Sequence, residues 1–311
     1  IFNVTTGNQV HKLSGATVFG ANDNNYFGRV AIDGNYAVVG ATGVDVGNKA
    51  NCGAVYIFDV TTGNFISREL AGDKEANDGL GESVSISGNY VLAGAKQKAS
   101  NTGAAYIFDI TTGNQIRKLV ASDGTSGDYF GNSVAISGNT AVVGAHYENS
   151  QDGAVYVFDV TTYSNQLHKL TPSPRVSEER FGQSVAISGN YIIIGAIGPS
   201  PYTGAAYIFD VTTGNQLRKL TASDPADNDN FGYSVAISGN YGVVGAIYND
   251  GPNNSGSAYI FDITTGNEIR KLTASDAAAN DNFGYSVAIS SNNIVIGAKT
   301  HNTSTGKAYI F

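Results

Sequence analysis

The sequence predicts an all-β protein, a six-bladed β-propeller of four-stranded antiparallel blades, and three observations lead to this fold class. One pattern recurs six times, at intervals of about fifty residues, along the 311-residue chain. Each copy contains several short apolar runs with the two-residue alternation of β-strands. The composition is rich in turn formers, with 39 glycines, and only 14% of the residues are charged. Repeats of four strands at this period are typical of propeller blades.

Each repeat starts at an aromatic residue or leucine that is followed by glycine. A propeller adds its repeats around one axis, so residues 1–311 are expected to form a single domain. The six repeats start near Phe27, Leu80, Phe130, Phe181, Phe231 and Phe283.

The four strands of a blade can be followed in the repeat that starts at Phe231. Tyr233, Val235 and Ile237 first alternate with Ser234, Ala236 and Ser238, as in a strand with two different faces. A Ser-Gly-Asn turn then leads into a second strand that contains Val243-Val244. After a loop of variable length come a third strand, Tyr259 to Phe261, a Thr-Thr-Gly-Asn turn, and a fourth strand from Ile269. Each repeat is therefore predicted to be a four-stranded meander.

Both ends of the chain fall within the predicted third strand. The chain begins with Ile1-Phe2 and stops at Phe311, which are corresponding positions of the repeat. Val10 to Leu13 is therefore expected to supply the outer strand of the last blade. This N-terminal strand would close the ring and remove two exposed sheet edges.

The FG, VGA and YIF elements recur over essentially the whole chain, and they resemble the FG-GAP repeats of integrin α-subunit heads and of many bacterial surface proteins. The resemblance implies a β-propeller used for adhesion or protein contact, in which FG opens the innermost strand and VGA ends the second. Members of this family most often have seven blades, whereas six are expected here.

Calcium-binding members of this family have several carboxylates in the hairpin between the FG strand and the VGA strand. Here that hairpin is a short turn, Asp33-Gly34-Asn35 in the first repeat and Ser-Gly-Asn in the next four. Calcium takes about six to eight oxygen ligands, and these turns offer at most one carboxylate. The family's metal site is therefore not expected in this hairpin, and no cofactor is predicted.

Four repeats have two acidic residues five positions apart, just ahead of the first strand. One interpretation is a calcium site or an acidic docking surface. The preferred interpretation is structural, because short acidic side chains accept hydrogen bonds from loop N–H groups and order the turn. The four pairs are Asp73 and Asp78, Asp123 and Asp128, Asp224 and Asp229, and Asp276 and Asp281.

The loops between the second and third strands differ most from repeat to repeat. Variable loops on a constant scaffold are where binding specificity usually lies. Three of these loops contain a tyrosine, Tyr147, Tyr202 or Tyr248, whose ring and hydroxyl group suit a protein or glycan ligand. The alternative is that these tyrosines face solvent and contact no ligand.

Several function classes are disfavoured. A net charge of −8 opposes nucleic-acid binding, which needs clustered Lys and Arg. No apolar run approaches the roughly 20 residues of a membrane-spanning helix. The four histidines are scattered, Cys52 is the only cysteine, and no catalytic motif occurs, so an enzyme is not expected.

Three N-x-S/T sequons, at Asn3, Asn253 and Asn302, are candidate N-glycosylation sites and agree with an extracellular or cell-surface location. We expect a binding, adhesion or scaffolding module that uses its loop face for protein or glycan contact. A carbohydrate-binding lectin is one alternative. A structural subunit of an extracellular filament or layer is another, in which basic outer strands with residues such as Arg270 and Lys271 would direct self-assembly.

Overall fold

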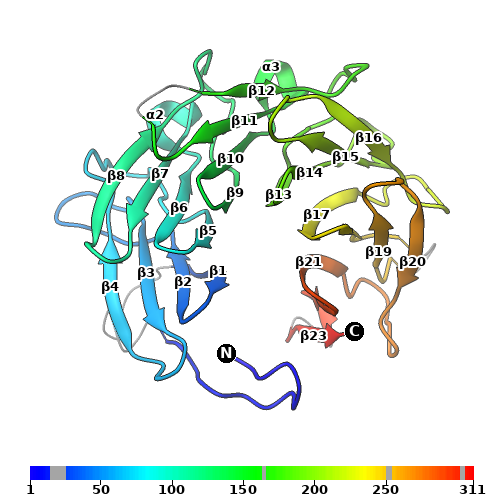
Figure 1. The fold of residues 1–311 in the computed structure, drawn as a ribbon, viewed down its shortest axis with the longest axis horizontal. Helices are drawn as coiled ribbons and strands as arrows, with labels where there is room; N and C mark the ends of the chain where they lie inside the picture. The colour runs from blue at the N-terminus through cyan, green and yellow to red at the C-terminus, as the bar shows by residue number, and fades with distance from the viewer. Residues whose placement is uncertain (15–25, 163–165, 250–253, 302–304) are drawn as a thin grey trace. The chain divides into compact units, whose positions relative to one another are not determined.

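The computed structural model describes residues 1–14, 26–162, 166–249, 254–301 and 305–311. Within these residues the chain forms six antiparallel β-sheets, whose strands follow one another in sequence order (Figure 1). The chain divides into two compact units. Unit 1 comprises Ile1–Glu148 and Tyr156–Leu167, and unit 2 comprises Asn149–Val155 and His168–Phe311.

The first three sheets have four strands each. Sheet 1 consists of β1 (Phe27–Asp33), β2 (Tyr36–Ala41), β3 (Ala54–Asp59) and β4 (Phe65–Glu69). Sheet 2 consists of β5 (Ser83–Ser87), β6 (Tyr90–Ala95), β7 (Ala104–Asp109) and β8 (Asn114–Leu119). Sheet 3 consists of β9 (Ser133–Ser137), β10 (Thr140–Ala145), β11 (Ala154–Asp159) and β12 (His168–Leu170).

The last three sheets belong to unit 2. Sheet 4 consists of β13 (Ser184–Ser188), β14 (Tyr191–Ala196), β15 (Ala205–Asp210) and β16 (Gln216–Leu220). Sheet 5 consists of β17 (Phe231–Ser238), β18 (Tyr241–Ala246), β19 (Ser257–Asp262) and β20 (Glu268–Leu272). Sheet 6 consists of β21 (Phe283–Ser290), β22 (Asn293–Ala298) and β23 (Lys307–Ile310). The predicted fold class is thus confirmed: the sheets are the antiparallel blades of an all-β propeller of six repeats.

The second and third strands form the core because both of their faces are covered. Five of the six residues of β6 are buried, and the same holds for β7. In sheet 2, Tyr106 and Phe108 pack in one cluster with Val38 of sheet 1, so the core continues from one sheet to the next. The fourth strand β8 is mostly exposed. Its polar sequence therefore suits an outer edge.

Neighbouring sheets approach closely at two glycines, which explains the FG and VGA elements. A Cβ atom on Gly94, at the end of β6, would lie 1.9 Å from the carbonyl oxygen of Gly131, at the start of the next sheet. Gly131 has a φ of +92°, which residues with a Cβ atom avoid. The Ser83 hydroxyl donates a hydrogen bond of 2.8 Å to the same oxygen. In unit 2 the contact recurs between Gly245 and Gly284, at 2.2 Å.

The first repeat departs from this pattern because its first strand is one residue shorter. After Phe27 the ladder of β1 resumes at Arg29, whereas in sheet 5 it resumes one residue later, at Ser234. Arg29 thus replaces the serine that bonds to the next sheet. Among the residues that the structure describes, none lies within 4 Å of a Cβ atom placed on Gly28.

The strand predicted from Val10 to Leu13 is not found in sheet 6, which has three strands in the described part of the chain. Instead, the Val10 N–H donates a hydrogen bond of 2.8 Å to the Ile1 carbonyl oxygen, and Phe2 forms a bridge with Gln9. The N-terminal residues therefore form a local hairpin, and closing so short a loop costs less entropy than a distant pairing.

Candidate functional site

The variable loops and the acidic loops meet on the same side of the sheets. The loop between the second and third strands of one sheet bonds to the loop that leads into the next sheet. The N–H of Tyr129 donates 2.9 Å to the Asn101 oxygen, and that of Asn230 donates 2.9 Å to the Tyr202 oxygen. These two kinds of loop therefore form one continuous surface within each unit.

The first acidic residue of each pair binds the tyrosine of the third strand. Asp73 accepts hydrogen bonds from the Tyr106 hydroxyl at 2.8 Å and from Lys118 Nζ at 2.7 Å. Burial alone would raise the pKa of Asp73, but these two bonds outweigh it and hold that pKa below its ordinary value of 3.8. Asp123 accepts from the Tyr156 hydroxyl at 2.9 Å. These contacts tie each loop to the third strand of its sheet, and Lys118 adds a contact to the outer strand β8.

The same arrangement recurs in unit 2. Asp224 accepts from the Tyr259 hydroxyl at 2.7 Å and from Lys271 Nζ at 2.8 Å. Asp276 accepts from the Tyr309 hydroxyl at 2.6 Å. Sheet 6 has three strands in the described residues, and Lys307 of β23 bonds to Asp276, at 2.5 Å. Hydrogen bonds from Lys307 and then Tyr309 lower the pKa of Asp276 to about 2.

The second acidic residue of each pair is buried and closes its own loop. Each accepts a hydrogen bond from the backbone N–H three residues earlier, as Asp78 does from Glu75 at 2.6 Å. Each is at most 4% exposed, and the four are Asp78, Asp128, Asp229 and Asp281. Burying a carboxylate is costly unless it is paired and hydrogen-bonded, so a second partner is needed.

For three of the four aspartates that second partner comes from the variable loop of the same sheet, and its identity changes. Asp128 instead accepts a hydrogen bond of 2.9 Å from the Thr125 hydroxyl of its own loop. Lys98 Nζ donates 2.7 Å to Asp78 in sheet 2. The Asn249 amide donates 2.8 Å to Asp229 in sheet 5. In sheet 6, Nδ1 of His301 lies 2.9 Å from Asp281. The three partners occupy the same position in their loops, but their residue types differ. The sequence did not reveal these partners because lysine, asparagine and histidine share no pattern.

The loop that leads into sheet 4 has different residues at the two acidic positions, and they make different hydrogen bonds. Pro174 and Glu179 occupy the two acidic positions there. Glu179 is one methylene longer than aspartate and hydrogen-bonds to the Tyr207 hydroxyl, the group that the first aspartate binds elsewhere. Glu179 is 3% exposed, and its Oε2 has no hydrogen-bond partner among the described residues. Burial raises the pKa of this carboxyl above 4.5.

These carboxylates serve within the loops as hydrogen-bond acceptors and counterions. In the parts of the chain that the structure describes, no three His, Cys, Asp or Glu side chains are grouped so as to hold a metal ion. The absence of a bound cofactor stays a prediction, which a thermal scan with calcium tests.

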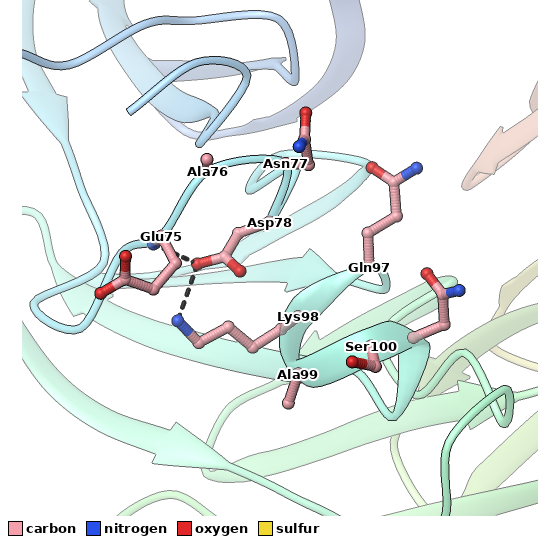
Figure 2. A pocket seen from close by; sticks show the side chains of 9 residues that line it. Glu75, Ala76, Asn77, Asp78, Gln97, Lys98, Ala99 and Ser100 are labelled. Carbon is pink, nitrogen blue, oxygen red and sulfur yellow. Dashed lines mark hydrogen bonds and ion pairs between the residues drawn. The ribbon is translucent and has the colours of Figure 1, made fainter. Parts of the chain in front are cut away.

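A pocket of about 520 Å³ opens in unit 1, between the loop that leads into β5 and the loop between β6 and β7 (Figure 2). It is lined by Glu75, Ala76, Asn77, Asp78, Gln97, Lys98, Ala99, Ser100 and Asn101. The last four residues form α2 (Lys98–Asn101), a single turn that the sequence did not predict. Pockets that bind small ligands have volumes of roughly 300–1,000 Å³.

The backbone of α2 holds the pocket's polar side chains in place. Ala99, Ser100 and Asn101 have positive φ angles of 52°, 58° and 67°. For a residue with a Cβ atom, this conformation costs about 1–2 kcal/mol. The neighbouring α3 (Glu148–Gln151) repeats the turn at Asn149 and Ser150. The same turn therefore occurs in two successive repeats, with different side chains.

The charged groups of the pocket are neutralised by partners. Lys98 Nζ lies 2.7 Å from Asp78 (Figure 2). It also donates a hydrogen bond to the Asp73 carbonyl oxygen. Glu75 forms an ion pair of 2.9 Å with Lys49. The side-chain groups of the pocket that remain available to a ligand are therefore mainly uncharged.

Amide and hydroxyl groups supply the remaining hydrogen-bonding capacity. The side chains of Gln97, Ser100 and Asn101 make no hydrogen bond to other described residues. Asn77 Oδ1 accepts 3.2 Å from the Asn51 amide. Figure 2 shows the Gln97 and Asn77 side chains reaching away from the backbone into the pocket.

The predicted ligand-binding tyrosines have different surroundings. Tyr147 belongs to unit 1, where its ring centroid lies 5.2 Å from that of Tyr129 and 4.4 Å from that of His146. In unit 2, the Tyr202 ring lies 5.6 Å from the Arg180 guanidinium carbon. Tyr248 is 38% exposed. Each tyrosine lies in the loop of its own sheet, and Tyr147 is part of an aromatic cluster.

Three groups that could act as a nucleophile or base are buried or lie against a backbone oxygen. Cys52 is buried, and burial raises the pKa of its thiol. Nε2 of His11 lies 3.0 Å from the Thr61 oxygen, and Nε2 of His168 lies 3.1 Å from that of Thr212. These histidines position the turns that follow the third strands.

One candidate glycosylation site lies in the described part of the chain. Oδ1 of Asn3 accepts hydrogen bonds from the N–H groups of Thr5 and Thr6, at 3.0 and 2.9 Å. The residue is exposed. Asn253 and Asn302 fall outside the described residues. Within the described residues, no helix has the length and apolar character needed to cross a membrane.

Comparison with known proteins agrees with this architecture. A crystal structure of the computationally designed Ika8 protein is similar, with a TM-score of 0.58 and 21% sequence identity over 92% of this chain and 71% of that one. At this identity the likeness concerns the fold alone. No curated protein matches the chain.

The FG-GAP repeat family matches six successive segments, which together cover most of the sequence. They are residues 17–58, 67–108, 114–158, 165–209, 215–261 and 267–311. Each matched segment ends within or just after the third strand of a sheet. The chain therefore belongs to the FG-GAP repeat family.

Proposed function

We propose that the chain is a non-catalytic binding module of the cell exterior, which contacts a protein or glycan ligand with the loops between its second and third strands. FG-GAP propellers often serve binding or adhesion, and their repeats are typical of extracellular proteins. The observation that supports this proposal most directly is the pocket around α2, where three side chains have unused hydrogen-bonding groups.

The rest of the molecule supports binding over catalysis. The buried carboxylates Asp78 and Asp229 are paired with loop side chains, and the Cys52 thiol is buried. Such groups order a surface but do not attack a substrate. The scaffold is constant between repeats while the loops vary, which is the arrangement expected of a recognition surface.

The proposal is tested by measuring how the labelled full chain binds to intact cells of several types. Gln97→Ala removes an exposed amide from the pocket and should weaken binding at least tenfold, because a central contact contributes about 1.4 kcal/mol or more. Asn89→Ala is the control, since this exposed residue lies in the hairpin at the opposite end of β6. It should bind as the wild type does.

Two results would contradict the proposal. The first is the absence of binding to every cell type tested. The second is binding that Asn89→Ala weakens as much as Gln97→Ala does, which would place the ligand away from the loops. Circular dichroism of each variant shows that its fold is intact before binding is compared.

A further inference from the structure

We infer that the ligand of the α2 pocket is a neutral saccharide, held by the pocket's amide groups and by the adjoining aromatic cluster of Tyr129, His146 and Tyr147. This inference rests on the proposed binding function and narrows it to one chemical class. All of the residues involved lie within unit 1.

The pocket and the aromatic cluster form one continuous surface. The Tyr129 N–H donates 2.9 Å to the carbonyl oxygen of Asn101, which lines the pocket. Three residues earlier in the same loop, the Ser126 hydroxyl donates 2.7 Å to the oxygen of Ser100, another lining residue. The loop that contains Tyr129 is thus hydrogen-bonded to α2, which lines the pocket.

The aromatic cluster supplies flat apolar surface beside the polar pocket. The rings of Tyr129 and Tyr147 meet nearly edge to face, with centroids 5.2 Å apart and planes at 69°. The His146 ring contacts Tyr147 at 86°. All three residues are partly exposed. A pyranose ring has an apolar face of C–H groups and a rim of hydroxyl groups, so it matches an aromatic ring next to amides.

The hydrogen-bonding groups of the pocket suit hydroxyl groups. An amide both donates and accepts, and a hydroxyl does the same, so Gln97, Asn101 and Ser100 can each exchange bonds with a polyol. The lysine is already bonded to Asp78 and Asp73, and Glu75 is paired with Lys49. The pocket therefore offers no uncommitted charge for an acidic or basic ligand.

A protein ligand fits the pocket less well. Protein interfaces gain most of their affinity from large aromatic or aliphatic side chains that enter apolar pockets. The apolar side chains that line this pocket are those of Ala76 and Ala99. Both side chains are small, so they offer no large apolar group for a protein's aromatic or aliphatic side chain to pack against, whereas a saccharide brings its own hydrogen-bonding groups.

The test is binding of the full chain to an array of immobilised neutral and acidic oligosaccharides. We expect retention on neutral saccharides, with Gln97→Ala and Tyr147→Ala each lowering the apparent affinity at least tenfold. Tyr147→Phe should retain most of the affinity if the ring is the contact. Asn89→Ala is the matched control and should bind like the wild type.

The outcomes separate this inference from the proposed function. Failure to bind any neutral saccharide overturns the inference, as does neutral-saccharide binding that neither pocket variant weakens. If the chain then binds cells in a way that protease treatment removes and periodate oxidation leaves intact, the binding function stands with a protein ligand. Cell binding that periodate removes and Gln97→Ala weakens supports the saccharide.

Discussion

The two aspartates of each acidic pair differ in burial and in hydrogen-bond partners, although the sequence alone does not distinguish them. Asp73 is exposed and accepts hydrogen bonds from Tyr106 of the third strand and from Lys118 of the fourth. Asp78 is buried and depends on Lys98. The five-residue spacing could be recognised from the sequence, because the loop length is constant. The partners could not, because they come from loops that vary.

The buried ion pair between Lys98 and Asp78 gives a first prediction. Replacing Lys98 by methionine leaves a buried carboxylate without its counterion, which should lower the free energy of unfolding by about 3–5 kcal/mol. Lys49→Met is the control. It removes an exposed pair with Glu75 and should cost less than about 1 kcal/mol. Urea denaturation at neutral pH measures the unfolding free energy of both variants. Equal decreases would show that the buried ion pair contributes no more to stability than the exposed one.

Glu179 gives a second prediction, on pH. Burial raises the pKa of this carboxyl above 4.5, so between pH 4.5 and its folded-state pKa the folded chain binds more protons than the unfolded chain. Its contribution to stability is therefore present below pH 4.5 and is lost as the pH rises through that window. Glu179→Gln does not titrate, and its stability relative to the wild type should grow over this range and then level off. A difference that stays constant, in urea titrations from about pH 4 to about pH 8, would show that the pKa is not raised.

At the scale of the strand, the sequence predicts most of what the structure contains. The alternation of residues in the repeat from Phe231 locates β17, and the pair Val243-Val244 lies within β18. The turns α2 and α3 could not be predicted, because non-glycine residues with positive φ leave no sequence signal. Val10 to Leu13 resembles a fourth strand, yet pairing with the nearby Ile1 takes precedence in the structure.

The close approach of sheets at glycine gives a third prediction. Gly131→Ala would place a Cβ atom 2.4 Å from the Ala104 oxygen at a φ of +92°, and overpacking with backbone strain should cost about 3–5 kcal/mol. Gly28 occupies the same motif position in the first repeat. It has no described residue within 4 Å, so Gly28→Ala should change stability by less than about 0.5 kcal/mol. If the two variants melt at the same temperature, the FG glycine does not hold the sheets together.

At the scale of the whole molecule, the sequence repeats made the fold predictable but did not identify the ligand. Six copies of one pattern fix the blade, because each copy repeats the same alternation and the same glycines. The pocket could not be foreseen, since its volume depends on how two loops of different sequence fold against each other. Of the three tyrosines that the loops suggested, Tyr147 lies in the aromatic cluster beside the pocket, and Tyr202 and Tyr248 have other surroundings.

Calcium gives a prediction for the complete chain. The carboxylates Asp78, Asp229 and Asp281 are buried with protein partners, so we expect excess calcium or a chelator to leave the melting temperature unchanged. A ligand that binds only the native state raises the melting temperature by mass action. A calcium-dependent rise in a thermal scan would therefore mean that the acidic pairs rearrange to bind the ion.

The central claim is that a constant scaffold presents exchangeable loops for ligand recognition. The turns α2 and α3 have matching φ angles, 52° at Ala99 against 50° at Asn149 and 58° at Ser100 against 60° at Ser150. The side chains of one turn can therefore be placed on the other. A chain with Gln97→Tyr, Ala99→Asn and Asn101→Gln takes on the sequence of α3 while Lys98 continues to bind Asp78.

Cell binding by this exchanged chain is the most direct test of that claim. We predict a melting temperature within about 2–4 °C of the wild type, because the backbone and the buried ion pair are kept. Binding to the cells that the wild type recognises should fall at least tenfold. An exchanged chain that is folded and binds those cells as tightly as the wild type would contradict the account, because recognition would then lie outside the α2 pocket.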